Sequence, residues 1–237
     1  MIAGKDFPDS EDFAEKLALG EFSVTAAGLL SGEENSGNSG ITAVSWNRDS
    51  AISARSLIIQ AETNNGFTEN YILYFDASYF TSKYSSCTSD ICARACDSMI
   101  LGFQYLTLEI LTRIEQHKSP AKLIFLLKTH PTFNEVIHSS ALKKMNLTPA
   151  NPIVAAAEAA FATFAENIAA KEIENEYASI VLVSGDQTNE VCKNDGTLAS
   201  WLKDYINALD QLKKGVPKSS SWVKAGAKAP SGFALFR

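Results

Sequence analysis

Several residues that could do chemistry gather after one apolar run. Residues 123–127, LIFLL, are followed directly by Lys128, Thr129 and His130. Polar residues that follow a buried parallel strand line the crevice in which open α/β sheets bind ligands. The sequence therefore favours a small-ligand pocket at this point. The ends of other predicted strands would add to the same crevice Asp76, Asp186 and Thr188.

Nucleophilic catalysis is a second hypothesis for this stretch. His130 and His138 flank Thr129 and Ser139, with Glu135 between them, so that a serine–histidine–acid triad can be drawn. The Gly-x-Ser-x-Gly turn that presents many such nucleophiles does not occur. We therefore favour loop and surface histidines over a triad.

Metal binding is a third hypothesis, because three of the four cysteines lie close together. Cys87, Cys92 and Cys96 fall near the start of a predicted helix, but their spacing matches no common zinc pattern and no histidine is near them in sequence. Cysteine is also a common small buried residue. We predict no metal site, and reduced thiols at these positions and at Cys192.

The elements that would position these residues alternate along the chain. Hydrophobic patterning predicts strands at residues 2–3, 22–27, 41–46, 71–75, 123–127, 178–183 and 233–236. It predicts helices at residues 10–19, 51–62, 89–116, 151–173 and 197–212, and a flexible loop at residues 31–40. Apolar strands separated by helices imply a parallel sheet covered on both faces. We expect an α/β fold in a single domain over residues 1–237, a three-layer Rossmann-like sandwich with a mainly parallel sheet of about seven strands.

The order of these segments resembles the short-chain dehydrogenase/reductase family over nearly the whole chain. MIAGKDFPDSEDFAEKLALGEFSVTAA, AVSWNRDS and YILYFDAS resemble its first four strands, and NPIVAAAEAAFATFAENIAAKEI resembles the helix that bears its Tyr-x-x-x-Lys motif. IVLVSGDQTNE resembles the following strand and turn. The resemblance implies cofactor-binding positions at Gly4, Asp49, Asp76, Ser184, Gly185 and Thr188.

The phosphate-binding turn departs from the family pattern. The family has Thr-Gly-x-x-x-Gly-x-Gly, whereas residues 3–10 read AGKDFPDS, so that only Gly4 remains and Pro8 and Ser10 replace the other glycines. Glycine allows the backbone to approach a pyrophosphate without a Cβ. Carboxylates at the start of the next helix would compete with a phosphate for the helix N-terminus, namely Asp6, Asp9, Glu11 and Asp12.

The catalytic positions depart as well. The resemblance places Val154 at the family tyrosine, Glu158 at the family lysine and Thr129 near the family serine. Valine transfers no proton, and glutamate has the wrong charge for the lysine's role. We therefore expect a degenerate family member without the usual hydride transfer and without a bound cofactor, which acts as a binding or subunit-interaction protein.

An enzyme remains the alternative: a divergent NAD(P)-dependent oxidoreductase with relocated catalytic groups. The residues to suspect are then Thr129, Lys128 and Tyr79. NAD or NADP would be its cofactor.

Composition limits the partners. The chain has 237 residues and a net charge of −6, which argues against nucleic-acid binding. We find no apolar run near the ~20 residues that cross a bilayer and no secretory signal at the start, and we expect a cytoplasmic protein without membrane contact. Residues 1–80 hold 12 acidic and 4 basic residues, whereas residues 213–237 hold 6 basic and no acidic residues. A solvated basic tail is the plain interpretation, and a docking surface for an anionic partner is the other.

The family resemblance also implies pairing of subunits. Its members associate through the two long helices, here residues 89–116 and 152–173. We expect a homodimer or homotetramer, or pairing with an active relative.

Overall fold

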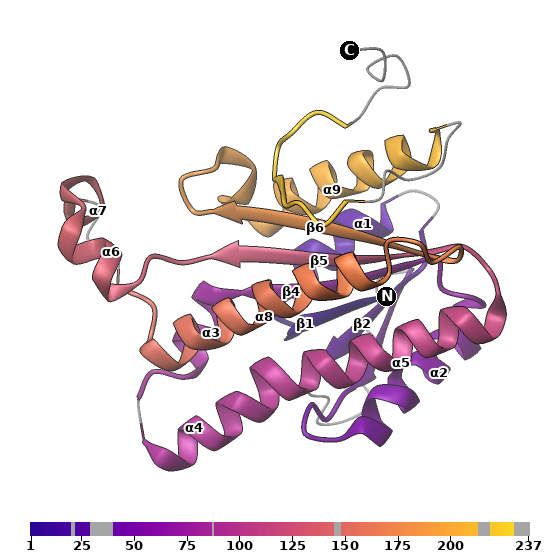
Figure 1. The fold of residues 1–237 in the computed structure, drawn as a ribbon, viewed down its shortest axis with the longest axis horizontal. Coiled ribbons are helices and arrows are strands. Elements are labelled where there is room, and N and C mark those ends of the chain that lie inside the picture. Colours follow the sequence, from indigo (N-terminus) through magenta and orange to yellow (C-terminus); the bar gives the residue numbers. More distant parts are fainter. Residues whose placement is uncertain (20–21, 29–39, 87, 145–147, 213–218, 230–237) are drawn as a thin grey trace.

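The computed structural model describes residues 1–19, 22–28, 40–86, 88–144, 148–212 and 219–229. A seven-stranded sheet in the order β3-β2-β1-β4-β5-β6-β7 forms its centre. Each neighbouring pair of strands is parallel. Helices cover both faces of this sheet (Figure 1). The predicted three-layer Rossmann-like fold is confirmed.

The elements alternate along the chain much as their sequence patterns predict. The strands are β1 Ile2–Phe7, β2 Val24–Gly28, β3 Ile41–Ser45, β4 Asn70–Asp76, β5 Ala121–Thr129, β6 Ala178–Asp186 and β7 Val223–Lys224. The α-helices are α1 Glu11–Ala18, α2 Ala51–Asn65, α3 Ala77–Lys83, α4 Ser89–Cys96, α5 Gly102–His117, α6 Phe133–His138, α7 Ser140–Lys144, α8 Pro152–Lys171 and α9 Asp195–Asp210.

The core has two halves, one on each side of the sheet. Side chains alternate along a strand, so that Leu73 and Phe75 of β4 pack in the half formed with α2, α5 and α8. Ile72 and Tyr74 of the same strand pack in the half formed with α1 and α9. Burial on both faces explains why β4, β5 and β6 are nearly continuous apolar runs.

The first strand is longer than its sequence predicts. We expected residues 2–3, but β1 continues to Phe7 and includes two charged residues, Lys5 and Asp6. Gly4 therefore lies inside the strand, with a φ of 128°, rather than in the turn that follows it. That turn begins at Pro8, after a cis peptide bond between Phe7 and Pro8.

The long predicted helix at residues 89–116 has an interruption. Helices α4 and α5 are joined by a π-helical turn over Asp97–Leu101, and α5 ends where Lys118 adopts a left-handed conformation with a φ of 51°. A π turn inserts one extra residue, which rotates the apolar stripe of α4 relative to that of α5.

Some elements were not predicted from the sequence. Helices α3, α6 and α7 were not expected, and α6 and α7 project from the body beyond the end of β5 (Figure 1). A seventh strand is present at Val223–Lys224. The strand expected at residues 233–236 lies outside the described residues, as do most of the loop expected at residues 31–40 and part of the basic tail.

Helix α8 corrects the expectation that no apolar run is near the length that crosses a bilayer. Its 20 residues are long and apolar enough to cross a membrane by length and composition alone. A core helix of a globular protein meets the same test, and α8 packs Val154, Phe161 and Ile168 in the core.

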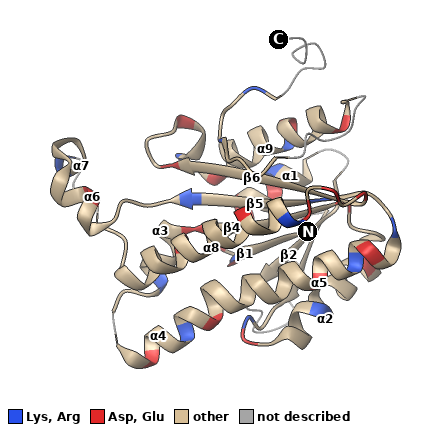
Figure 2. Ribbon diagram, viewed as in Figure 1, with Lys and Arg blue, Asp and Glu red and all other residues tan. Residues whose placement is uncertain are grey.

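Charged residues of both signs are distributed along the other helices in the view of Figure 2.

Candidate functional site

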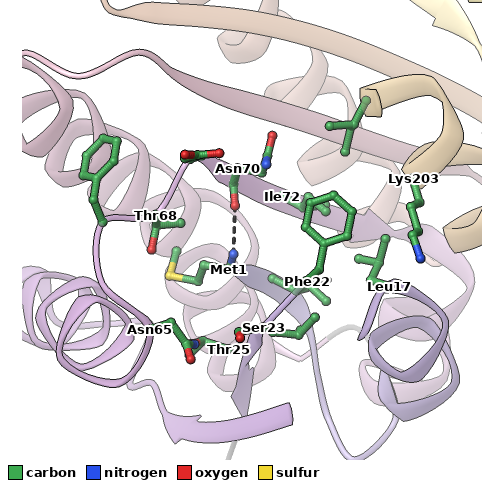
Figure 3. Close-up of a pocket in the computed structure, with 15 residues that line it drawn as sticks. Met1, Leu17, Phe22, Ser23, Thr25, Asn65, Thr68, Asn70, Ile72 and Lys203 are labelled. Carbon is green, nitrogen blue, oxygen red and sulfur yellow. Dashed lines mark hydrogen bonds between the residues drawn. The ribbon is translucent and has the colours of Figure 1, made fainter. Parts of the chain in front are cut away.

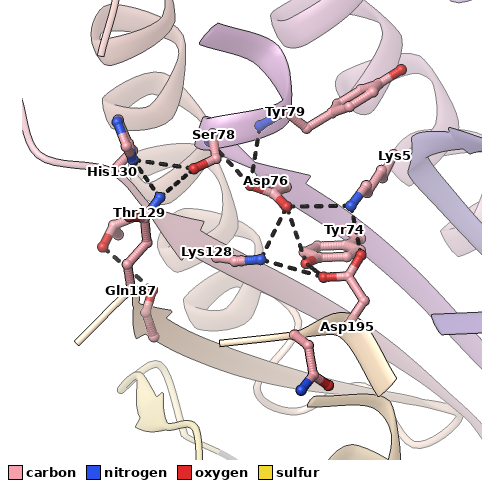
Figure 4. Close-up of polar contacts among 12 residues, drawn as sticks. Lys5, Tyr74, Asp76, Ser78, Tyr79, Lys128, Thr129, His130, Gln187 and Asp195 are labelled. Carbon is pink, nitrogen blue, oxygen red and sulfur yellow. Dashed lines mark hydrogen bonds and ion pairs between the residues drawn. The ribbon is translucent and has the colours of Figure 1, made fainter. Parts of the chain in front are cut away.

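A buried group of paired charges lies where β1, β4 and β5 end. All strands are parallel, so their carboxyl ends meet at one edge of the sheet, which we call the carboxyl edge. Lys5 of β1 donates to Asp195 of α9 at 2.6 Å, and Lys128 of β5 lies 3.3 Å from both Asp195 and Asp76. Tyr74 donates to Asp195 at 2.9 Å (Figure 4). Two lysines and two aspartates therefore neutralise one another inside the fold.

The pKa shifts of this group follow from that pairing. Burial would lower the pKa of Lys128, but the carboxylates of Asp76 and Asp195 outweigh burial and raise it. Burial would raise the pKa of Asp195, but Lys5 and Lys128 hold it below its usual value. Burial raises the pKa of Tyr74 well above its ordinary value, so its hydroxyl stays protonated. Pairing thus favours the charged forms of Lys128 and Asp195 despite their burial.

A second group of charges is centred on Asp6. Its carboxylate accepts from Arg48 at 2.5 Å, from Lys83 at 2.5 Å and from the Tyr79 hydroxyl at 2.8 Å. Arg48 also donates to the carbonyl oxygen of Gly4, and its guanidinium lies 4.7 Å from the centre of the Trp46 ring. Arg48 and Lys83 offset the burial of Asp6 and hold its pKa below the usual value. The carboxylate that we expected to repel a phosphate is therefore already neutralised.

The glycines near this edge serve packing between strands. A Cβ on Gly4 would lie 2.0 Å from the carbonyl oxygen of Tyr74, on the neighbouring strand. A Cβ on Gly28 would lie 2.6 Å from the carbonyl oxygen of Phe7. These two glycines allow β1 to approach β4 and β2 closely. Neither lies in the loop between β1 and α1.

A serine, a histidine and a glutamine join the segments that follow β4, β5 and β6. His130 Nε2 lies 2.6 Å from the carbonyl oxygen of Thr148, which can only accept, so Nε2 carries the ring proton. Nδ1 therefore accepts, and it lies 3.1 Å from Ser78 Oγ and 2.8 Å from Gln187 Nε2 (Figure 4). Gln187 Nε2 also donates to Ser78 Oγ at 2.5 Å. The segments after β4, β5 and β6 are linked by these bonds.

Beside this trio lies a cavity of about 290 Å³, which we call the edge cavity. Leu142 and Pro131 supply part of its wall, and its polar lining includes Thr129, His130, Glu135, Glu158, Asp186, Gln187 and Thr188. Glu158 comes from α8, and burial raises the pKa of its carboxyl to about 7. Its Oε2 is buried without a hydrogen-bond partner among the described residues. The edge cavity thus combines hydroxyl, amide and carboxyl groups.

The sequence-predicted residues divide between this cavity and other places. Thr129, Glu158 and Thr188 line the edge cavity, and Asp186 lies there as well. Asp76 belongs to the buried charge group and caps α3, whereas Asp49 lines a separate cavity of about 200 Å³ near Arg48. Val154 is fully buried in the core. Ser184 pairs with β7 through Lys224, and a Cβ on Gly185 would lie 2.3 Å from Cys192 Sγ.

The residues named in the triad hypothesis and in the metal hypothesis make other contacts in the structure. His130 contacts Ser78 and Gln187, whereas Thr129 donates to Gly185 O at 3.3 Å and Glu135 caps its own helix. Cys92, Cys96 and Cys192 are free thiols, and Cys87 lies outside the described residues. Among the described residues, no group of three or more potential ligands could hold a metal ion.

Sequence reasoning did not single out several residues of these groups. Ser78, Gln187 and Asp195 each come from a loop or helix start far along the chain from their partners. The position of Gln187, four residues after the predicted strand at residues 178–183, was a usable signal. Arg48 follows a strand in the same way.

A further cavity, of about 240 Å³, lies at the opposite edge of the sheet (Figure 3). Apolar side chains that include Leu17, Phe22 and Ile72 line it, with Asn65 and Lys203 among its polar residues. Asn65 donates to Thr25, and Lys203 donates to the carbonyl oxygen of Leu19.

Comparison of the sequence with protein-family models gives no match, and comparison with curated proteins gives none either. Solved structures do match. A short-chain dehydrogenase from Mycobacterium smegmatis is 12% identical with a TM-score of 0.65, over 97% of this chain and 91% of that one. Serine dehydrogenase from Escherichia coli is 8% identical with a TM-score of 0.61, over 94% of each chain.

A third match has the same architecture. A short-chain dehydrogenase/reductase from Brucella melitensis, described as a glucose/ribitol dehydrogenase, is 12% identical with a TM-score of 0.59, over 95% of this chain and 94% of that one. These likenesses show that the chain has the fold of the short-chain dehydrogenases/reductases. The resemblance stated from sequence is confirmed at the level of fold.

Proposed function

We propose that this chain is a short-chain-dehydrogenase-like protein that acts by binding a small ligand rather than by hydride transfer. The observation that carries the proposal is the internal pairing of the cations at the carboxyl edge. Two ion-pair groups, centred on Asp195 and on Asp6, contain Lys5, Lys128, Arg48 and Lys83. A dinucleotide's diphosphate needs unpaired donors and positive potential at this edge. These four side chains already balance carboxylates of the fold.

The loop after β1 supports the same proposal, because its residues do not fit a pyrophosphate. That loop consists of Pro8, Asp9 and Ser10. Pro8 has no backbone N–H to donate, and Asp9 adds a negative charge. Gly4 and Gly28 are used in strand packing, as described above. We therefore propose that NAD and NADP do not bind here.

The catalytic positions implied by the family resemblance add support. Val154, at the position of the family tyrosine, is buried in the core and has no titratable group. Glu158, at the position of the family lysine, carries a carboxyl with a pKa of about 7. A carboxyl at that position cannot lower the pKa of a neighbouring acid by charge, as a lysine does.

A divergent NAD(P)-dependent oxidoreductase is the second candidate. The observation in its favour is the edge cavity, where Thr129 and Glu158 lie together at the edge on which such folds bind ligands. The other suspected residues favour it less. Lys128 is paired with two aspartates, and Tyr79 donates to Asp6, which together with burial raises the pKa of its hydroxyl.

Thermal unfolding with added cofactor separates the two candidates. We expect neither NADH nor NADPH to change the melting temperature. A ligand at 100 times its Kd stabilises the native state by about 2.7 kcal/mol. A concentration-dependent rise in melting temperature with either cofactor would overturn the binding-protein proposal and favour the oxidoreductase.

Subunit pairing belongs to the same proposal. We propose a homodimer or homotetramer through α4–α5 and α8, in the cytoplasm, without nucleic-acid or membrane contact. Leu108 of α5 is 51% exposed and Ile173, just after α8, is 43% exposed. Exposed large apolar side chains on or next to these helices are consistent with a covered surface.

A further inference from the structure

Ser78 and His130 form a hydrogen-bonded pair in which one side chain can act as a nucleophile and the other as its base. Ser78 Oγ lies 3.1 Å from His130 Nδ1 (Figure 4). His130 Nε2 donates its proton to the carbonyl oxygen of Thr148 at 2.6 Å, so Nδ1 is the unprotonated nitrogen of the neutral ring. The serine hydroxyl can therefore give its proton to Nδ1, as nucleophilic catalysis by serine requires.

A third group orients the base, which is the other part of such an arrangement. The bond to the Thr148 carbonyl oxygen fixes both the tautomer and the orientation of the His130 ring. His130 is 8% exposed, and its backbone N–H donates to the carboxyl group of Glu158 on α8. A carbonyl oxygen carries no full charge and stabilises an imidazolium less than an aspartate does, so we expect slow turnover.

The serine is held in place by the start of α3. Its backbone N–H and that of Tyr79 donate to Asp76 Oδ1 at 3.0 Å and 3.2 Å, so Asp76 caps the helix. Asp76 is itself paired with Lys128 in the buried charge group. That group therefore sets the position of Ser78, which remains partly exposed to solvent.

Gln187 adds a hydrogen-bond donor beside the serine oxygen. Its Nε2 lies 2.5 Å from Ser78 Oγ and 2.8 Å from His130 Nδ1. When a serine oxygen attacks a carbonyl carbon, the carbonyl oxygen becomes an oxyanion next to it, and side-chain amides stabilise such oxyanions. His130 and Gln187 also line the edge cavity, whose volume of about 290 Å³ suits a small substrate.

We propose that Ser78, His130 and Gln187 form an acyl-transfer site that hydrolyses esters of short carboxylic acids. Ser78 Oγ attacks the ester carbonyl carbon while His130 Nδ1 takes the Oγ proton. The bond to the alkoxy oxygen then breaks, and His130 returns the proton to the departing alcohol. Water attacks the acyl-serine in the same way, which releases the carboxylic acid and restores the Ser78 hydroxyl. Ester and water thus become acid and alcohol, with no change of oxidation state.

The lining of the edge cavity limits the acyl group. Pro131 and Leu142 provide an apolar wall for a short carbon chain. Among the described residues, neither Lys nor Arg lines this cavity, whereas Glu135, Glu158 and Asp186 do. Because carboxylates repel an anionic substrate, we choose a neutral ester, p-nitrophenyl butyrate, as the probe.

Covalent labelling of the full chain tests the nucleophile directly. A fluorophosphonate reacts with an activated serine by forming a phosphorus–oxygen bond and releasing fluoride. We expect peptide mass spectrometry to place the label on Ser78. An unlabelled Ser78, in a sample where an added serine hydrolase is fully labelled, would overturn the proposal.

Hydrolysis of p-nitrophenyl butyrate tests the roles of the single residues. Ser78→Ala and His130→Gln should each lower kcat/KM about 100-fold, and Gln187→Ala should lower kcat with little change in KM. Ser82→Ala is the matched control, because Ser82 lies one turn further along α3 and donates to the carbonyl oxygen of Tyr79, so it should hydrolyse the ester at the wild-type rate. Unchanged hydrolysis by Ser78→Ala, shown to be folded by circular dichroism, would contradict the assignment. Should Ser78→Ala not fold, the position of the label in the wild type decides.

The acyl-transfer site goes beyond the proposed function, and the two can fail separately. A rise in melting temperature with NADH would overturn the proposed function and leave a labelled Ser78 standing as the nucleophile. An unlabelled Ser78 without any effect of NADH would overturn the acyl-transfer site alone.

Discussion

Glu158 illustrates how one side chain can make the stability of the fold depend on pH. Burial raises its carboxyl pKa from 4.5 to about 7, so the folded state retains a proton that the unfolded chain has released. Between about pH 4.5 and pH 7 the unfolded state binds fewer protons at this group, and the free energy of unfolding falls as the pH rises. Below pH 4.5 the group is protonated in both states and has no effect of this kind.

We expect Glu158→Gln to remove this contribution. The variant should be more stable than the wild type at pH 8 by about 1 kcal/mol, a figure reduced for the partial exposure of the side chain. At pH 4.5 the two proteins should differ much less. Urea unfolding at both pH values checks this. An identical pH dependence in wild type and variant would show that Glu158 titrates normally.

Asp195 is the residue on which the buried charge group depends most. Replacing it with asparagine leaves the Lys5 and Lys128 ammonium groups to share the single carboxylate of Asp76. Removing one partner of a buried ion pair typically costs about 3–5 kcal/mol. We expect a loss of that size for Asp195→Asn in urea unfolding at pH 7. Asp204→Asn on the exposed face of the same helix is the control, with a loss below about 1 kcal/mol.

At the scale of elements, β1 is held against β4 by a glycine. Gly4→Ala would place a Cβ 2.0 Å from the Tyr74 carbonyl oxygen at a φ of 128°. Both the clash and the backbone conformation are unfavourable, so we expect a loss of about 3 kcal/mol or more. Gly66→Ala is the matched control, because Gly66 has a φ of 77° and nothing within 4 Å of an added Cβ. Its ψ is −165°, so an alanine there has backbone strain but no clash, and its loss should be smaller than that of Gly4→Ala, within about 1–3 kcal/mol. Equal losses in urea unfolding would contradict this role of Gly4.

Element prediction succeeded where local patterning and burial agree. Residues 71–75 and 123–127 are apolar throughout, and each forms the centre of a strand buried on both faces. Asn151 and Pro152 start α8 as expected, with the Asn151 side chain accepting from Ile153 N. The predicted end of β1 was wrong because the charged residues Lys5 and Asp6 are typical of a loop sequence. Only contacts with distant residues neutralise these two charges.

The site was predictable only in part for the same reason. Thr129 and Glu158 could be named through the family resemblance, and both line the edge cavity. The partners of His130, in contrast, lie 52 and 57 residues away in sequence. No local pattern pairs such residues, because the strand order of the sheet brings them together.

At the scale of the whole molecule, the proposed pairing of subunits can be tested on the exposed side of α5. Leu108→Arg introduces a charge into the predicted interface and should shift light scattering from a dimer or tetramer to the mass of a single chain. Ile52→Arg changes an equally apolar residue on α2, 83% exposed and outside that interface, and should leave the mass unchanged. A wild-type protein with the mass of one chain would refute subunit pairing.

The ion pair between Lys5 and Asp195 joins residues that are 190 positions apart. During synthesis, β1, β4 and β5 leave the ribosome well before α9. Lys5, Asp76 and Lys128 are therefore exposed to water until Asp195 is available to pair with the lysines. Domains often fold as synthesis proceeds, from the N-terminal side onwards. For this chain, we expect a nascent sheet whose carboxyl edge stays hydrated until the final helix docks.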